Sequence, residues 1–587
     1  PRMIRDRRCI AALAVALAVA LAAAPAAAQR APEGASGWND RAAVEARRFI
    51  AATANPHATD AAYAMLARGG SAVDAAIAAQ LVLGLVEPQS SGLGGGAFML
   101  VHDAPSGRLH AYDGRETAPA AATPARFLTE NGSPAKFDAV VATGLSVGVP
   151  GLVRLLELAH RKHGRLPWAS LFEPAIALAD QGFVVSPRLA TLIAADRHLA
   201  GSPRAAAYFH DAAGKPLEAG ARLRNPAYAA TLRTLSREGA NAFYTGAIAA
   251  DIVSTVRSHL RSPGDLTLAD LAGYRAVERE PACGAYRRYR VCGMPPPSSG
   301  GTTVLAILGM LERFDLAAMG VESFWSAHVL SEAGRLAYAD RNRYVGDPAF
   351  VDVPAGIVGP AYLRERSRLI PVTGSLGRAA AGDPPREAHR RKVAFADAAA
   401  LELPSTSHLS IVDARGGAVS MTTTIEDAFG SRLMTASGFL LNNQLTDFSF
   451  APEQDGRAIA NRVEPGKRPR SSMAPTIVYD AAGRVRLVVG SPGGSSIINY
   501  VAKTIVAVLD WGLDPQAAVA LPNLGSRNGP TELEAGTAAA GLAPKLRAMG
   551  HEVAVIPMTS GTQAVVRTRD GLSGGADPRR EGTVRGR

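Results

Sequence analysis

The sequence predicts an α+β fold, because helical and strand-type hydrophobic patterns both occur and dominate different parts of the chain. Apolar residues recur at helical spacing between Ala43 and Leu85. The alternation typical of a β-hairpin begins at Thr406. Residues 371–405, immediately before it, are dense in Ala, Gly, Pro and Arg and show little periodicity. We therefore expect a mobile connector that ends where the hairpin begins.

The first thirty residues have the pattern of an export signal. Arg5, Arg7 and Arg8 precede an apolar run from Ile10 to Ala24, and a small-residue site follows at 26–28. This order predicts a secretory signal peptide over residues 1–28 and a periplasmic or secreted protein. The run is short for a membrane span, which makes an uncleaved anchor the alternative. The Arg pair leaves the general and the twin-arginine export routes both open.

Composition indicates a globular protein and gives no sign of a nucleic-acid partner. Hydrophobic residues make up 47% and charged residues 20% of the 587 residues. The formal net charge is +11, and because residues 1–28 hold four Arg and one Asp, the remainder carries +8. These charges are spread along the chain without the basic, aromatic-interleaved stripe of nucleic-acid binders. We expect a solvated basic surface, and no membrane contact after signal removal.

The helical segments come mainly in the first two thirds of the chain. Residues 61–66 and 72–82 form two predicted helices separated by Gly69-Gly70. A Gly-rich turn over 90–96 then leads into a predicted strand over 97–102. Further amphipathic helices are predicted at Leu152–His163, Ser170–Gln181, Ala227–Arg237 and Phe324–Tyr344.

After residue 405 the pattern becomes strongly β. Residues 406–413 and 418–425 form a predicted hairpin around the turn at 414–417. Folding about that turn brings Thr424 to within about a residue of facing Thr406. A second strand pair is predicted at 476–479 and 485–489, around the turn Ala481-Ala482-Gly483.

Two of the three cysteines lie outside the predicted signal. Cys283 and Cys292 stand close together in a strand-like run. An oxidising compartment permits a disulfide between them, and the pattern is equally compatible with two free thiols. Neither cysteine has the spacing of a metal ligand, so we expect no metal site.

Short blocks stand in order along the chain: Glu87-Pro88-Gln89-Ser90-Ser91-Gly92, Asp113-Gly114-Arg115-Glu116, Val147-Gly148-Val149-Pro150-Gly151, Pro295-Pro296-Pro297-Ser298-Ser299-Gly300-Gly301, Ala339-Asp340-Arg341, Thr406-Ser407-His408-Leu409-Ser410, Leu441-Asn442-Asn443-Gln444, Arg468-Pro469-Arg470-Ser471-Ser472-Met473 and Ser491-Pro492-Gly493-Gly494-Ser495. This ordered set resembles the gamma-glutamyltransferase family of N-terminal-nucleophile hydrolases. The resemblance implies a four-layer αββα sandwich, built as a heterodimer from one self-processed precursor. Its large subunit is expected over 29–405 and its small catalytic subunit over 406–587.

By this resemblance, cleavage between Ser405 and Thr406 creates the catalytic nucleophile. The new α-amino group has a reference pKa near 8 and can act as a base beside its own hydroxyl. Thr424 matches the threonine that orients the nucleophile. The Gly493-Gly494 pair matches the glycines whose amides bind the oxyanion, the alternative being an ordinary turn.

The resemblance also assigns residues to the two charged groups of a gamma-glutamyl substrate. A planar guanidinium suits the α-carboxylate, although a surface ion pair is the alternative for this arginine. The carboxylate is assigned to Arg115, Ser471 and Ser472, and the α-ammonium to Asp447, Gln444 and Glu426.

Two departures from the family pattern bear on substrate choice. Several members have Asn where this chain has Glu426, and 448–470 is short and contains no Tyr. We expect an open pocket with room for bulky acyl donors.

The implied reaction is transfer of a gamma-glutamyl group from glutathione or a similar compound to water, an amino acid or a peptide, with no cofactor. An acylase-like amidase acting on glutaryl beta-lactams and an exported scaffold or solute-binding protein without catalysis are the alternatives.

Overall fold

The computed structural model describes residues 35–386, 395–398 and 405–587. The predicted signal peptide and part of the predicted connector lie outside the described residues. Everything described before residue 387 and after residue 404 belongs to one compact unit, and that unit is the subject below. Among the described residues no helix is both long and apolar enough to cross a membrane.

Two seven-stranded sheets form the centre of the unit. One has the order β21-β2-β10-β11-β3-β4-β7 and the other β1-β20-β19-β15-β14-β9-β8, and all neighbouring strands within them are antiparallel. Their strands are Val44–Ala46 (β1), Ile50–Thr53 (β2), Gly96–Asp103 (β3), Arg108–Gly114 (β4), Val277–Arg279 (β7), Ala282–Tyr286 (β8), Tyr289–Gly293 (β9), Ser405–Val412 (β10), Ala418–Glu426 (β11), Thr476–Tyr479 (β14), Val485–Gly490 (β15), Gln563–Arg567 (β19), Leu572–Ala576 (β20) and Thr583–Gly586 (β21).

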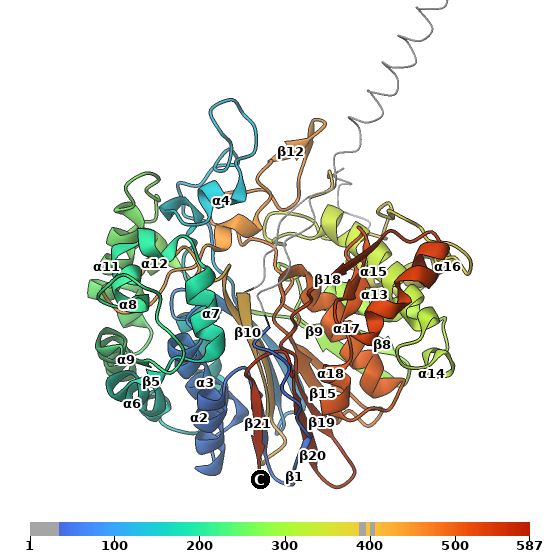
Figure 1. The fold of residues 1–587 in the computed structure, drawn as a ribbon, viewed down its shortest axis with the longest axis horizontal. Helices are drawn as coiled ribbons and strands as arrows, with labels where there is room; N and C mark the ends of the chain where they lie inside the picture. Colours follow the sequence, from blue (N-terminus) through green and yellow to red (C-terminus); the bar gives the residue numbers. More distant parts are fainter. Residues whose placement is uncertain (1–34, 387–394, 399–404) are drawn as a thin grey trace, which may run out of the picture. The chain divides into compact units, whose positions relative to one another are not determined.

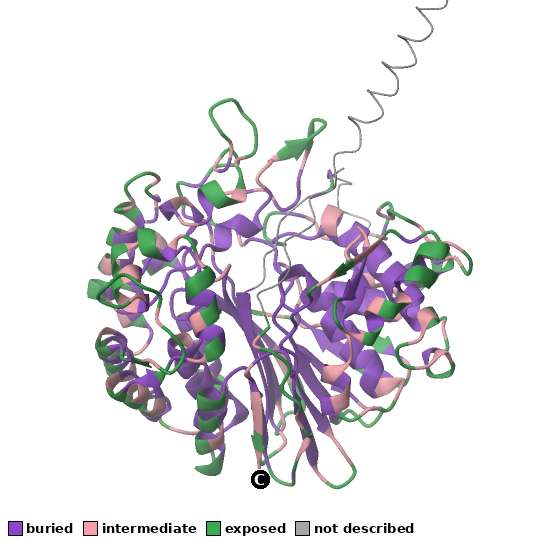
Figure 2. Cartoon of the chain, in the orientation of Figure 1, coloured by how far each residue is buried: buried purple, intermediate pink, exposed green. Residues whose placement is uncertain are grey.

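Helices cover the outer face of each sheet, which gives four layers (Figure 1). One apolar core joins the first sheet to a helical layer, and a second core fills the space between the sheets and reaches the other helical layer. The central strands of the two sheets are buried, and many exposed residues lie on the outer sides of the helices (Figure 2). The first helical layer includes Pro56–Ala67 (α2), Ala72–Val86 (α3), Leu152–His163 (α5), Glu173–Gln181 (α6) and Pro226–Glu238 (α9), and the second includes Gly300–Leu311 (α13), Phe324–Tyr344 (α15) and Ile497–Leu509 (α17).

The predicted αββα sandwich is thus confirmed, and most predicted elements lie where the sequence placed them. Helices α5 and α15 have the predicted bounds. The helix predicted at 170–181 differs, because a 3₁₀ turn at Trp168–Leu171 precedes α6. Pro174 lacks an N–H and is tolerated only in the first turn of a helix, so a new helix begins beside it.

The β10–β11 hairpin is the element that positions the site. Its register pairs Thr406 with Thr424 and Ser405 with Glu426, with an irregularity between the first two pairs. His408, two residues after Thr406 and therefore on the same face, lies against Gly490 of the opposite sheet. A Cβ at residue 490 would lie 2.2 Å from the imidazole ring, so glycine is required for the sheets to approach there.

The two cysteines form a cross-strand disulfide. Cys283 of β8 pairs with Cys292 of β9 in the sheet register, and their sulfur atoms are bonded. This resolves the choice that the sequence left open between a bridge and two free thiols.

Candidate active site

Two threonine hydroxyls meet at the start of the β10–β11 hairpin. The Thr406 hydroxyl donates to Thr424 Oγ1 across 3.3 Å. Thr424 Oγ1 also accepts from the Glu426 amide at 2.8 Å and donates to the Ser405 carbonyl oxygen at 2.6 Å. A chain of hydrogen bonds with a defined direction therefore runs from the Thr406 hydroxyl to the carbonyl of the peptide bond before it.

The two residues joined by that peptide bond are each held by a further hydrogen bond. The Ser405 hydroxyl donates to the carbonyl of Gln89, in the turn after α3. The Arg580 guanidinium donates to the Thr406 carbonyl at 3.2 Å. Ser405 and Thr406 are both buried, at 0% and 4% exposure, so the bond lies inside the molecule and not on a surface loop.

A pocket opens beside the two threonines. It contains all the residues that the sequence assigned to substrate binding and catalysis, except Ser405 and Gly493, together with Met473 and Ile497, which the sequence did not assign. The lining residues are Arg115, Thr406, Thr424, Glu426, Gln444, Asp447, Ser471, Ser472, Met473, Gly494 and Ile497.

A buried ion pair occupies one side of the pocket. The Arg115 guanidinium contacts the Asp447 carboxylate and also donates to the carbonyls of Pro469 at 3.1 Å and Arg470 at 2.8 Å. Gln444 Nε2 donates to the same Asp447 oxygen at 2.7 Å. Arg115 is completely buried, which excludes the surface ion pair considered from the sequence.

Glu116 adds a carboxyl group behind this pair. Its Oε2 lies 3.8 Å from Arg115 Nη1, and neither of its oxygens has a hydrogen-bond partner among the described residues. Burial raises the pKa of Glu116 to about 8, with Arg115 opposing the rise. The group is therefore largely protonated at neutral pH, and Asp447 remains the main counter-charge of Arg115.

The serine pair of the pocket is held by the loop before α13. Ser299 donates from both its amide and its hydroxyl to the Ser471 carbonyl, each at 2.7 Å. The Ser471 hydroxyl oxygen accepts from the Met473 amide at 3.1 Å. The Pro-Ser-Ser-Gly-Gly block noted in the sequence therefore supports the second serine block from a distant part of the chain.

Glu426 is held in an uncommon conformation. Its φ is +83°, in the left-handed region that disfavours residues with a side chain. The Asn443 side chain donates to the Glu426 carboxylate and accepts from the Asp427 amide at 3.0 Å. Asn443 stood in a recognised sequence block, but only the fold shows that it fixes Glu426.

The Gly493-Gly494 pair lies where β15 turns into α17. Their φ angles are +136° and +56°, and a Cβ at Gly493 would lie 2.5 Å from the Tyr500 ring. Glycine is therefore required on both conformational and steric grounds. Among the described residues neither amide has a hydrogen-bond acceptor, so Gly494 can present its N–H to a group in the pocket.

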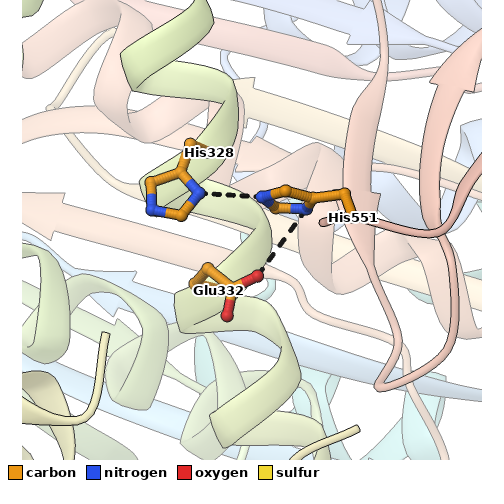
Figure 3. Close-up of side chains that lie close together, drawn as sticks. All are labelled: His328, Glu332 and His551. Atoms are coloured by element: carbon orange, nitrogen blue, oxygen red, sulfur yellow. Dashed lines mark hydrogen bonds and ion pairs between the residues drawn. The ribbon is translucent and has the colours of Figure 1, made fainter. Parts of the chain in front are cut away.

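A second buried polar cluster joins His328 and Glu332 of α15 to His551 (Figure 3). His328 Nε2 donates to the Pro371 carbonyl at 2.8 Å, which leaves Nδ1 to accept from His551 Nε2 at 2.8 Å. His551 Nδ1 then accepts from the Thr531 hydroxyl at 2.8 Å. All four ring nitrogens are satisfied in this arrangement.

The same cluster has the residue types of a metal site, but its hydrogen bonds fit a structural network better. Glu332 accepts from Arg335 Nε at 3.0 Å, from the Ser375 hydroxyl at 2.7 Å and from the Leu376 amide at 3.0 Å. A cation would have to displace these donors next to the Arg335 charge. We assign the cluster to holding residues 371–377 against the C-terminal part of the chain.

Comparison with known proteins agrees with this geometry. The family model described as Gamma-glutamyltranspeptidase matches residues 58–586. The glutathione hydrolase proenzyme of Bacillus subtilis is 38% identical over 520 residues, covering 87% of this chain and 86% of the relative. The proenzyme of the same name from Escherichia coli is 37% identical over 550 residues, covering 91% of each.

Acylases are also similar. The acylase ACY 1 proenzyme of Pseudomonas sp. strain SE83 is 34% identical over 546 residues, covering 91% of this chain and 93% of the relative. The crystal structure of a cephalosporin acylase from Bacillus halodurans superposes with a TM-score of 0.80 at 27% identity, covering 93% of this chain and 97% of that one. The Helicobacter pylori gamma-glutamyltranspeptidase gives 0.52 at 34% identity, covering 57% of this chain and 93% of that one. On the match over nearly the whole chain and the identity to these relatives, the protein belongs to the gamma-glutamyltranspeptidase family.

Proposed function

We propose that this protein is a gamma-glutamyltransferase with glutathione hydrolase activity, and that it cuts its own chain between Ser405 and Thr406. The observation that carries the proposal is the hydrogen-bonded Thr406–Thr424 pair, at the mouth of a pocket with both a cation and an anion. The products are a large subunit ending at Ser405, whose expected first residue follows position 28, and a small subunit of residues 406–587.

Self-cleavage starts from the arrangement around the Ser405 carbonyl. The Thr406 oxygen attacks the carbonyl carbon while the Thr424 hydroxyl stabilises the developing negative charge on the carbonyl oxygen, which lies 2.6 Å away. The C–N bond then breaks, the nitrogen takes up the proton that the Thr406 hydroxyl loses, and Ser405 is left as an ester on Thr406. Water hydrolyses that ester, which frees the carboxyl group of Ser405 and the amino group of Thr406.

In the cleaved enzyme the α-amino group of Thr406 takes the proton from its own hydroxyl during attack on the substrate. A free α-amino group has a pKa of about 8, close to the value a general base needs near neutral pH. The attack forms a gamma-glutamyl ester and expels an amine, which leaves with a proton. Water, an amino acid or a peptide then takes the gamma-glutamyl group in a second, equivalent attack.

The pocket offers one set of residues for each charged group of an α-amino acid. Arg115, Ser471 and Ser472 are proposed to bind the α-carboxylate. Asp447 and Glu426 are proposed to bind the α-ammonium, with Gln444 Oε1, a buried acceptor without a partner among the described residues. Arg115 and Asp447 satisfy each other here, so a substrate with both charges replaces one ion pair by two.

Gly493 and Gly494 are proposed to bind the oxyanion of the tetrahedral intermediate. Their positive φ angles support this role, and so does the lack of an acceptor for either amide within the part of the chain that the structure describes. The chemistry involves only acyl and proton transfer, so we propose no cofactor. We expect the donors to be glutathione and other gamma-glutamyl compounds.

A second candidate is an acylase that removes glutaryl groups from beta-lactams, in keeping with the acylase relatives. None of the residues that line the pocket comes from 448–470, whose short strands Glu453–Gln454 (β12) and Arg457–Ala458 (β13) form a separate hairpin. The open pocket favours bulky donors. The acceptors gathered for an ammonium favour a gamma-glutamyl donor, because a glutaryl group has no amine to occupy them.

We further propose that the protein acts outside the cytoplasm, in the periplasm or the medium. The predicted signal peptide over 1–28 supports this, and so does the disulfide between Cys283 and Cys292, because disulfides persist in oxidising compartments.

The deciding experiment is a denaturing gel of wild type beside Thr406→Ala, followed by sequencing of the small fragment. We expect two wild-type fragments, the smaller beginning at Thr406, and one uncut, inactive chain for the variant. Activity on gamma-glutamyl-p-nitroanilide and glutaryl-p-nitroanilide separates the two candidate functions. A wild type that hydrolyses either substrate while remaining whole would refute the mechanism.

A further inference from the structure

Arg341 of α15 lies directly behind the serine pair of the pocket, although it does not line the pocket itself. Its Nη2 donates to the Ser472 hydroxyl oxygen at 2.6 Å and its Nε donates to the Ser299 hydroxyl oxygen at 2.8 Å. The residue is only 3% exposed, and its guanidinium also lies over the Tyr338 ring. The side chain therefore has a defined position against Ser472 and Ser299.

The direction of these hydrogen bonds controls what the serines can do. A guanidinium can only donate, so Ser472 must accept from Arg341. That contact favours a hydroxyl rotamer whose hydrogen points away from Arg341. Ser471 shows the same polarity, because its hydroxyl oxygen accepts from the Met473 amide at 3.1 Å. Both hydroxyl oxygens therefore act as acceptors, which directs their hydrogens away from Arg341 and from the Met473 amide.

The Nε group of Arg341 supports Ser471 indirectly, through Ser299. Ser299 accepts from Arg341 and passes its own hydroxyl hydrogen to the Ser471 carbonyl at 2.7 Å. One guanidinium therefore fixes the backbone of Ser471 and the hydroxyl of Ser472. A lysine ammonium at the same place lacks the planar group with two divergent donors, so it cannot donate to Ser299 and Ser472 equally well.

We propose that Arg341 is a positioning residue that makes the Ser471–Ser472 pair selective for an acyl donor with a carboxylate at that end. It acts by orienting the Ser472 hydroxyl, and its positive charge behind the serine strengthens that hydrogen bond to an anion. The inference rests on the proposed function, because it assumes that the donor carboxylate lies on Arg115, Ser471 and Ser472. It adds a second cation to the carboxylate side of the pocket.

The test compares Arg341→Met, Ser472→Ala and the double variant. For gamma-glutamyl-p-nitroanilide we expect Arg341→Met to raise KM by about 10-fold to 100-fold with kcat nearly unchanged, the size of a lost hydrogen bond to a charged group. In the Ser472→Ala background the same substitution should raise KM by no more than about 3-fold, because the hydroxyl through which it acts is gone. Equal effects in both backgrounds would overturn the proposal.

Substrate analogues provide a readout that a merely structural role would not change. Glutaryl-p-nitroanilide keeps the carboxylate and lacks the ammonium, whereas 4-aminobutyryl-p-nitroanilide keeps the ammonium and lacks the carboxylate. Arg341→Met should reduce kcat/KM by a similar factor for gamma-glutamyl and glutaryl substrates and leave the 4-aminobutyryl rate unchanged. A similar loss on all three substrates would contradict the assignment.

Control measurements distinguish a folding defect, and a failure of the proposed function, from a failure of the role proposed for Arg341. Arg343→Met, two residues along the same helix in an ion pair with Asp397, should match wild type. Chain cleavage on a gel shows whether each variant folds, and Arg341→Lys provides a conservative variant with an intermediate KM if Arg341→Met stays uncut. A wild type without activity on any of these donors defeats the proposed function. If the wild type is active and both Arg341→Lys and Arg341→Met have the wild-type KM, only the role of Arg341 is defeated.

Discussion

The pocket beside Thr406 and the cluster around His551 are both buried groups of polar side chains, yet only one of them is open to a ligand. In the histidine cluster every ring nitrogen and both Glu332 oxygens have partners within the protein. In the pocket, Gln444 Oε1 lacks a partner among the described residues, and an arginine and two carboxylates line the open space.

This difference separates a structural network from a binding site. Buried polar groups are costly unless they are hydrogen-bonded, so a complete network stabilises the fold and needs nothing further. An incomplete network beside a pocket leaves polar groups that can hydrogen-bond to a ligand. The titratable residue types alone do not distinguish the two clusters, because the histidine cluster has the more metal-like composition.

The largest effect is expected at the hydroxyl that links the two threonines. Thr424→Val keeps the shape of the side chain but removes the hydrogen bonds to Thr406, Glu426 and the Ser405 carbonyl. We expect chain cleavage to slow by about 100-fold to 1,000-fold, the cost of losing one oxyanion donor. A gel time course measures it. Thr423→Val, on the opposite face of the strand, is the control, and equal rates in the two variants would show that the Thr424 hydroxyl has no role.

A smaller effect is expected at the anionic side of the pocket. Asp447→Asn keeps the size of the side chain but removes the charge proposed to bind the substrate ammonium, and it leaves Arg115 without its main counter-charge. We expect KM for gamma-glutamyl-p-nitroanilide to rise by about 10-fold to 100-fold. The rise should be smaller for glutaryl-p-nitroanilide, which has no ammonium. Equal changes for both substrates would place the ammonium elsewhere.

The histidine cluster should respond in stability and not in substrate binding. His551→Phe removes the donor to His328 and the acceptor of the Thr531 hydroxyl. We expect a loss of about 1–3 kcal/mol in the free energy of unfolding, the cost of unpaired buried polar groups. Chemical denaturation measures this loss, and KM should match wild type. A large change in KM with unchanged stability would make the cluster part of the site.

The smallest effect expected is a pH dependence from the same histidine. Burial lowers the pKa of His551 to about 4; the neighbouring His328 and Arg335 add to the shift and Glu332 opposes it. An unfolded histidine has a pKa of about 6.5, so between these values the unfolded chain binds more protons than the folded one. The contribution of His551 is therefore complete above about pH 6.5 and is lost as the pH falls towards 4.

Unfolding free energies of wild type and His551→Phe at pH 7 and pH 5 test this sign. We expect the difference between the two proteins to shrink at pH 5, because protonation already opposes the wild-type network there. A difference that grows as the pH falls would show that the folded protein prefers the protonated ring.

The β10–β11 hairpin shows how far the sequence reached. Alternation and the turn at 414–417 placed Thr424 within about a residue of Thr406, and the observed register pairs the two. The helix at 324–344 was likewise predicted with its observed bounds. Local patterns of this kind depend on neighbours along the chain, which the sequence contains directly.

The histidine cluster shows what the sequence missed. His328 and His551 are 223 residues apart, and neither stands in a block that carried the family resemblance. The sequence also missed the role of Arg341. This residue stood in a recognised block but had no assigned partner. Its contacts with Ser299 and Ser472 require α15, the loop before α13 and the segment before β14 to pack together.

By itself the sequence predicted the β10–β11 hairpin, several of the helices, the family, and most of the residues that line the pocket, because periodicity and ordered blocks are properties of the chain. Only the tertiary structure decided that Arg115 is buried against Asp447, that the two cysteines are joined, and that the histidine cluster is complete in itself. The physical reason is that burial and hydrogen-bond direction are set by contacts between segments far apart in sequence. Those contacts exist only after the sheets and helices have packed.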